Sequence, residues 1–230
     1  MEELQSCLKD LTVFSKLTPD ELKLVCQSSY EKHYQKGEII FFENDEHGGL
    51  YLLVSGRVKL SMLSPEGKEK VLNILQEGDI MGEISFFDLD PHPITAETME
   101  NARIVIIPRE KLEEIITDQP GLALKIIISL AKKTRLLTSQ VRELVFHDAA
   151  GRMASLLRRF ADDFGVEING GKMIDLILTH KEIANLIGSS RVTVTKIMNN
   201  FIDEGIIKMY KRKIVIVDEE KLGKKLHTSI

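Results

Sequence analysis

The stretch from Leu178 to Gly205, LTHKEIANLIGSSRVTVTKIMNNFIDEG, constrains the fold of this chain more than any other. Thr179, followed three residues later by Glu182, has the pattern of a capping box, in which each side chain accepts a hydrogen bond from a free backbone N–H at a helix start. Gly188 suits the end of that helix, because the residue after a helix C-terminus often needs a positive φ. Ser189 or Ser190 can then cap a second helix. The stretch therefore predicts two short helices joined by a tight turn.

The second of these helices has one apolar face and one polar face. Its apolar residues recur at helical spacing and are expected to face a core: Val194, Ile197, Met198 and Phe201. The opposite face carries Arg191, Val192, Thr195 and Lys196 near the N-terminal end. The first turns of a recognition helix meet base edges in the major groove, so the pattern predicts a helix-turn-helix over residues 179–201. Spacing alone leaves open an ordinary helical hairpin, in which the charges of the outer face are merely solvated.

The segment after these helices, IIKMYKRKIVIV, favours a β-hairpin with a basic tip over residues 206–217. A helix pair followed by such a ribbon is a winged helix. Lysine and arginine suit phosphate contacts, which position a protein on DNA without reading its sequence. The expected phosphate contacts are Lys211, Arg212 and Lys213, with Lys208 beside them.

The charge distribution is consistent with this prediction, although the whole chain of 230 residues has a net charge of −4. From residue 149 onward there are 14 Lys+Arg against 10 Asp+Glu, net +4. Residues 1–148 hold 17 against 25, net −8. The C-terminal part can therefore approach phosphates, whereas the N-terminal part repels them.

Several other classes of protein find little support. The start of the chain lacks the basic residues of a signal peptide, and no apolar run is long enough for a membrane span, so a cytoplasmic location without membrane contact is expected. Cys7 and Cys26 are too few for a disulfide framework and are expected to be reduced thiols. No P-loop, nucleophile elbow or HExxH motif is present, so an enzyme is not expected.

The chain as a whole is expected to be α+β, with most of its strands in the N-terminal part. Residues 1–30 favour helix, with Thr18, Pro19 and Glu21 in a second capping box. From residue 33 to about 108, short apolar runs alternate with glycines, as in an antiparallel sandwich or barrel. This pattern predicts a β-roll of the double-stranded jelly-roll type with flanking helices over residues 1–120.

A long helix is expected over residues 121–147. Its apolar residues alternate steps of three and four, the seam of a coiled coil, which favours a homodimer over a single amphipathic helix packed on its own domain. The expected interface consists of Ile127, Leu130, Leu137, Val141 and Leu144. A hinge over residues 147–151, with Asp148 as a cap, leads into a DNA-binding domain at 148–230. Within that domain we expect a helix at 149–164, a polar loop at 164–171 and a strand at 172–178.

This order of elements resembles the CRP/FNR family of bacterial transcription regulators over essentially the whole chain. The strongest motifs are Gly82-Glu83-Ile84-Ser85 in the roll and IGSSRVTV, residues 187–194, in the helix-turn-helix. The resemblance implies a homodimer that binds double-stranded DNA, contacts RNA polymerase and responds to a small effector sensed by residues 1–120. Thr179, Ser189 and Ser190 are also expected among the DNA contacts. RVTVT, residues 191–195, is also similar to the nitrogen-control branch of the family, which implies GTA…TAC half-sites.

The effector itself is harder to assign. In members that bind cyclic AMP, a Gly-Glu pair is followed after about ten residues by Arg-Ser/Thr-Ala, where Glu holds the ribose and Arg the phosphate. Gly82, Glu83 and Thr95 match that motif, but Ile94 stands at the arginine position, which argues against cyclic AMP. Thr138 and Ser139 fall near the position that contacts the purine. The roll could also be empty, with Glu83 as a turn residue bonded to backbone amides.

Metal and cofactor sites are not expected. The N-terminal cysteine cluster of an iron-sulfur sensor is absent, and a haem sensor would need an axial ligand. The histidines of the sensing part, His33, His47 and His92, are interpreted as surface loop residues. A redox or haem gas sensor of the same fold, and a small-molecule-binding module that docks protein, are the alternatives.

Overall fold

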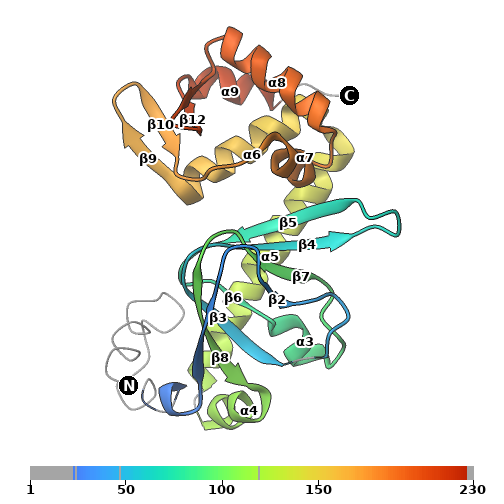
Figure 1. Cartoon of the computed structure of the whole chain (residues 1–230), viewed down its shortest axis with the longest axis vertical. Helices are drawn as coiled ribbons and strands as arrows, with labels where there is room; N and C mark the ends of the chain where they lie inside the picture. The colour runs from blue at the N-terminus through green and yellow to red at the C-terminus, as the bar shows by residue number, and fades with distance from the viewer. Residues whose placement is uncertain (1–22, 24, 47, 119, 227–230) are drawn as a thin grey trace. The chain divides into compact units, whose positions relative to one another are not determined.

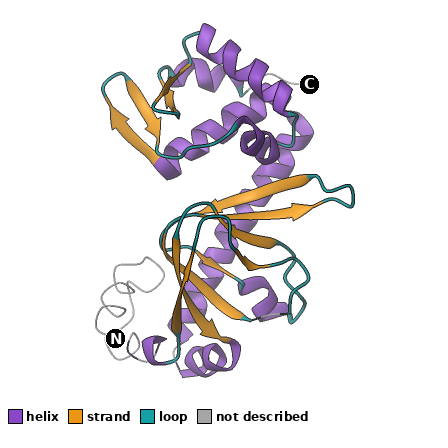
Figure 2. Ribbon diagram, viewed as in Figure 1, coloured by secondary structure: helices purple, strands orange, loops and turns teal. Residues whose placement is uncertain are grey.

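The computed structural model describes residues 23, 25–46, 48–118 and 120–226 and divides the chain into two units, residues 1–135 and 136–230 (Figure 1). The predicted capping box at Thr18–Glu21, Cys7 and His47 lie outside the described residues. The predicted α+β class is confirmed, with a strand-rich N-terminal unit and a C-terminal unit of helices and one small sheet (Figure 2). Among the described helices, none is both long enough and apolar enough to cross a bilayer.

The roll consists of two antiparallel sheets of four strands each, which is the predicted sandwich and not a closed barrel. One sheet has the order β1-β8-β3-β6 and the other β2-β7-β4-β5. The strands of the first are β1 (Tyr30–Tyr34), β8 (Ala102–Pro108), β3 (Gly49–Ser55) and β6 (Ile80–Met81). Those of the second are β2 (Ile39–Phe41), β7 (Thr95–Thr98), β4 (Val58–Leu63) and β5 (Glu69–Leu75).

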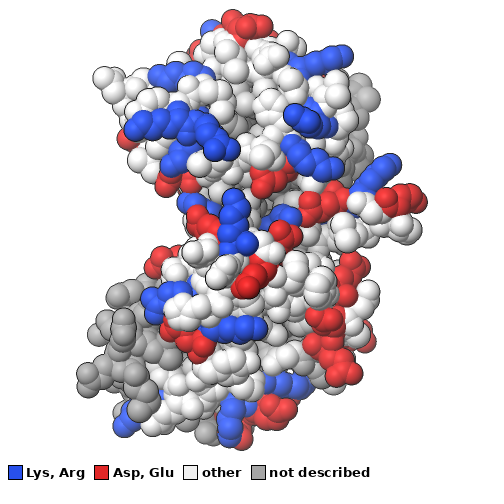
Figure 3. Space-filling view, viewed as in Figure 1, with Lys and Arg blue, Asp and Glu red and all other residues white. Residues whose placement is uncertain are grey.

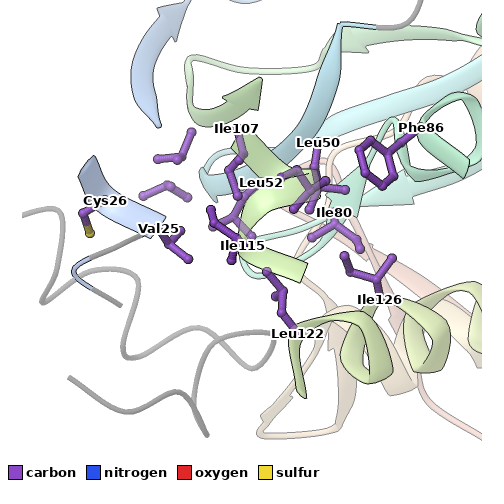
Figure 4. Close-up of a cluster of buried hydrophobic side chains, with 13 residues drawn as sticks. Val25, Cys26, Leu50, Leu52, Ile80, Phe86, Ile107, Ile115, Leu122 and Ile126 are labelled. Atoms are coloured by element: carbon purple, nitrogen blue, oxygen red, sulfur yellow. The ribbon is translucent and has the colours of Figure 1, made fainter. Parts of the chain in front are cut away.

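Strand β3 separates two apolar cores. Leu50, Leu52 and Val54 point into one cluster, while Tyr51 and Leu53 point into the other, as the two-residue period of a strand requires. The first cluster also takes residues from β8, α4 (Arg109–Asp118) and α5 (Pro120–Phe146) (Figure 4). The second fills the space between the two sheets. Because each fully buried side chain of this kind contributes roughly 1.5–3 kcal/mol, β3 stabilises both cores of the roll.

Helix α5 begins at Pro120, a residue whose fixed φ suits the first turn of a helix. Leu122 and Ile126 are fully buried in the first core cluster, so the start of α5 belongs to the roll. The division between the two units falls within this helix, between Arg135 and Leu136.

After the last part of α5, the C-terminal unit continues with the predicted helix α6 (Ala149–Phe164). Asp148 caps α6 by accepting a hydrogen bond from the Gly151 N–H at 2.7 Å. Its remaining elements are β9 (Gly165–Ile168), β10 (Gly171–Ile174), α7 (His180–Ile187), α8 (Arg191–Asp203), β11 (Ile207–Tyr210), β12 (Lys213–Ile216) and α9 (Glu219–Lys225). Its sheet has the order β11-β12-β10-β9.

Two predictions for this unit were wrong. Residues 165–168, expected as loop, form strand β9, which pairs with β10 through a tight turn at Gly170 and Gly171, both of positive φ. The strand expected over 172–178 is β10 and ends at Ile174. Strand β9 is the edge of the sheet, so its mostly exposed residues give no alternating apolar signal.

Candidate nucleic-acid interface and effector site

The predicted capping box starts helix α7. The Thr179 hydroxyl accepts a hydrogen bond from the Glu182 N–H at 3.2 Å, and the Glu182 carboxylate accepts one from the Thr179 N–H at 2.6 Å. Both of these donors would otherwise lack a partner in the helix. Thr179 therefore caps α7. The residue is exposed at the start of the helix, and its contact with DNA stays a prediction.

The turn between α7 and α8 has the geometry that its glycine allows. Gly188 adopts φ 62°, and the N–H groups of Gly188 and Ser189 both donate to the Ala184 carbonyl. Of the two candidate caps, Ser190 is the one used, because its hydroxyl accepts a hydrogen bond from the Thr193 N–H at 3.0 Å. Ser189 remains in the turn itself.

Helix α8 is anchored through its predicted apolar face, since Val194, Ile197, Met198 and Phe201 are all buried. The opposite side presents Arg191 and Lys196, both exposed, and Val192, which is 66% exposed. An apolar side chain that is this exposed buries little surface and so contributes little to the stability of the fold. The N-terminal end of α8 thus offers one guanidinium, one ammonium and one methyl-bearing surface to a partner.

The hydroxyl of Thr195 is hydrogen-bonded within the domain. Its hydroxyl donates a hydrogen bond to the Arg191 carbonyl at 3.0 Å and lies 2.8 Å from His180 Nδ1 on α7. The one proton of this hydroxyl is therefore used inside the domain, and the contact of Thr195 with a base or phosphate stays a prediction. His180 was missed by the sequence analysis, which had no signal that a residue 15 positions away lay against Thr195.

The wing carries four basic residues in two different situations. Lys213 forms an ion pair with Asp175, and the Lys208 ammonium donates to the Gly170 carbonyl at 3.1 Å, so both strand residues are bound to their own domain. Lys211 and Arg212, at the tip between β11 and β12, are exposed. Lys213 is therefore paired within its own domain, and its phosphate contact stays a prediction. Figure 3 shows Lys and Arg side chains gathered on the visible face of the C-terminal unit.

In the roll, the Gly82-Glu83 motif sits at the start of α3 (Glu83–Asp88). Gly82 adopts φ 84°, and a Cβ there would lie 2.7 Å from the Gly49 carbonyl oxygen, so only glycine fits. Glu83 is 2% exposed, and its carboxylate lies 2.5 Å from Lys133 Nζ on α5. Lys133 also donates to the Ile80 carbonyl at 2.7 Å. The interpretation of Glu83 as a turn residue bonded to backbone amides is wrong, because its partner is a lysine 50 residues away.

The other predicted effector residues of the roll also lie in the N-terminal unit. Ile94 is half-buried and packs against the second core cluster, while the neighbouring Thr95 hydroxyl accepts a hydrogen bond from the Glu43 N–H at 3.0 Å. Ser85 is buried, and its hydroxyl lies 2.9 Å from His92 Nδ1, whereas Ile84 is exposed. The arginine position of the motif is thus filled by an aliphatic side chain that belongs to the core.

His92 corrects a further prediction. It was interpreted as a surface loop residue, but it is 2% exposed and its ring stacks on Phe41 with centroids 3.9 Å apart. Pro91 and Pro93, on either side of it, are exposed. His33 is solvent-exposed, as expected, but it lies in strand β1 and not in a loop. Within the described residues, no group of three or more His, Cys, Asp or Glu could hold a metal ion.

Helix α5 exposes a long apolar surface. Ile127, Leu137, Val141 and Leu144 of the predicted seam are between 43% and 61% exposed. Leu130 is instead partly buried against the first core cluster, so its assignment to the interface is corrected in part. Leu124, Ile128, Val145 and Phe146 of the same helix are also exposed. Thr138 is exposed on the same helix, and Ser139 donates to Glu143 at 3.2 Å.

Comparisons with known proteins agree with this architecture. Residues 31–119 match the cyclic nucleotide-binding domain model, and residues 151–225 match the Crp-like helix-turn-helix domain model. A "CRP-like cAMP-activated global transcriptional regulator" of Mycobacterium tuberculosis is 30% identical over 213 residues, which cover 93% of this chain and 95% of that protein. The chain belongs to the CRP/FNR family.

Two further matches extend this CRP/FNR assignment. A global nitrogen regulator of Synechocystis is 30% identical over 188 residues, covering 80% of this chain and 82% of the relative. The solved structure of a CooA mutant from Carboxydothermus hydrogenoformans matches with a TM-score of 0.76 at 30% identity, covering 87% of this chain and 88% of that one. The CRP/FNR fold and its DNA-binding helix-turn-helix are therefore shared over nearly the whole length.

Proposed function

We propose that this CRP/FNR member is a homodimeric transcription regulator that binds a two-fold symmetric DNA site, with α8 of each protomer in the major groove. The observation that carries the proposal is the division of α8 into a fully anchored apolar face and an exposed end bearing Arg191, Val192 and Lys196. A recognition helix needs this combination of a fixed axis and free side chains at its first turns.

The base contacts follow from the chemistry of two side chains. The Arg191 guanidinium can donate two hydrogen bonds to guanine O6 and N7, and Val192 can contact only an apolar group such as the thymine methyl. The family resemblance implies GTA half-sites for the nitrogen-control branch, and a global nitrogen regulator is among the relatives. The operator we propose is an inverted repeat close to GTA…TAC, with its halves about one helical turn apart.

Dimerisation is proposed to use the exposed apolar surface of α5. An apolar surface of this extent is uncommon on a monomeric protein in water, and a second copy of the same helix would cover it through a coiled-coil seam. The resulting dimer would present two recognition helices to the two half-sites. Bound at a promoter, it would contact RNA polymerase, as the family resemblance implies.

The effector is proposed to be a small molecule other than cyclic AMP, acting through the roll near Glu83. The match to the cyclic nucleotide-binding domain model supports a ligand in this domain, and the Mycobacterium tuberculosis relative is described as cAMP-activated. Here, however, Ile94 offers no charge to a cyclic phosphate. A desolvated phosphate without its guanidinium loses on the order of 3–5 kcal/mol of binding free energy.

The proposal is tested by fluorescence anisotropy on a duplex carrying the inverted repeat, over a series of salt concentrations. We expect log K to fall steeply with log salt, by about 0.9 for each phosphate contact. Arg191→Ala should weaken binding, whereas Lys224→Ala on α9, which removes an equal charge from a residue paired with Glu220, should not. Retention of the protein on a heparin column is a second measurement. Retention that does not change with salt, or no retention, would favour the alternative of a module that docks protein.

A further inference from the structure

The tip of the wing has an unusual backbone for the residues it carries. Tyr210 pairs with Lys213, so only two residues connect β11 to β12. Those residues are Lys211, with φ 48°, and Arg212, with φ 67°. Two successive positive φ values define the tight hairpin turn that strongly prefers Asn-Gly or Asp-Gly. Two long β-carbon-bearing cations therefore occupy positions that a glycine-containing turn would fill with less strain.

Among the described residues, neither Lys211 nor Arg212 forms an ion pair that would offset this strain. The Lys211 ammonium lies 5.3 Å from the centre of the neighbouring Tyr210 ring, an exposed contact. Arg212 is exposed and, among the described residues, has no hydrogen bond or ion pair. The strand residues Lys208 and Lys213 show the opposite arrangement, because Gly170 and Asp175 hold their ammonium groups. Strain retained at exposed residues points to a role outside the domain.

The shape and chemistry of the tip fit the minor groove of DNA. A two-residue turn is the narrowest end that a hairpin can present, and the minor groove is only about 6 Å wide. Its potential is most negative where A·T-rich sequence narrows it, and arginine is favoured there because a guanidinium is more weakly hydrated than an ammonium. A phosphate contact would need neither the strained turn nor a guanidinium, since a lysine on a flexible stem supplies the same charge.

We infer that the wing tip places the Arg212 guanidinium in the minor groove flanking each half-site, and that Arg212 makes the protein select A·T-rich flanks. Lys211 supports this placement from the same turn. The inference rests on the proposed function, because it assumes that α8 of the same domain binds the adjacent major groove.

The test compares three duplexes that share one half-site sequence and differ only in the flanks: A·T, G·C, and inosine·C. Inosine lacks the guanine N2 amino group in the minor groove but keeps the major-groove pattern of guanine. The wild type should bind the A·T and inosine·C duplexes about tenfold more tightly than the G·C duplex. Arg212→Lys should lose this preference while keeping the salt dependence, since the charge is retained.

A second variant separates binding from folding. Lys211→Asn combined with Arg212→Gly installs the residues that the turn prefers, so its melting temperature should equal or exceed that of the wild type while its affinity falls on all three duplexes. Equal wild-type affinity for the three flanks, or an unchanged flank preference in Arg212→Lys, would overturn the inference. If the wild type bound no duplex at all, the proposed function itself would be overturned, and this inference with it.

Discussion

Lys133 Nζ lies 2.5 Å from the carboxylate of Glu83, a residue that is 2% exposed and stands at the position where the family resemblance implies a ribose contact. Both residues belong to the N-terminal unit. A carboxylate buried to this extent would be costly without a counter-charge, and Lys133 supplies one from α5. The roll can therefore fold with Glu83 paired to Lys133 whether or not an effector is bound.

Removing the lysine alone should destabilise the roll. Lys133→Met leaves the buried Glu83 charge unpaired, which should lower the free energy of unfolding by about 3 kcal/mol. Adding Glu83→Gln removes that charge, so the double variant should recover a large part of the loss. Chemical denaturation of the wild type, both single variants and the double variant measures the coupling. Additive effects would mean that the two side chains do not interact in solution.

Cyclic AMP should not be a ligand of the unmodified protein. Isothermal titration calorimetry is expected to detect no binding in the micromolar range, because Ile94 supplies no cation for the phosphate. Ile94→Arg should introduce measurable affinity, and Ile94→Leu, which keeps the aliphatic packing, should not. A micromolar dissociation constant for the wild type would contradict our assignment of the effector class.

The dimer can be broken from the middle of the exposed surface of α5. Leu137→Glu combined with Val141→Glu should place like charges in a desolvated interface and give a monomer that binds DNA weakly. Lys132→Glu is the matched control, since it adds a carboxylate to an exposed position of the same helix without removing an apolar contact. Analytical ultracentrifugation distinguishes the two outcomes, and a wild type that sediments as a monomer at micromolar concentration would reject the dimer.

The features that the sequence predicted well are those set by neighbours along the chain. The capping box of Thr179 and Glu182, the positive φ of Gly188 and the apolar face of α8 all depend on residues within one or two helical turns. Composition could not show which of the basic wing residues are free. Lys213 was expected on DNA and is bound by Asp175, which lies 38 residues earlier in the chain.

The same limit applies to the roll. Gly82 and Glu83 were found from their motif, but the partner of Glu83 lies on α5, and no local pattern connects the two. His92 was expected in a surface loop; only the folded roll shows that its ring is buried against Phe41. Pairings between distant segments therefore account for most of the errors in the site.

The central claim is that Arg191 reads a guanine in each half of a symmetric operator, and selection from random DNA tests it most directly. The wild type should enrich an inverted repeat close to GTA…TAC, with its halves about one helical turn apart. Arg191→Ala should lose about 1–3 kcal/mol of binding free energy and relax the preference at the guanine, whereas Lys211→Ala should weaken binding to all sequences similarly. A consensus without guanine at that position, or one unchanged in Arg191→Ala, would contradict the account.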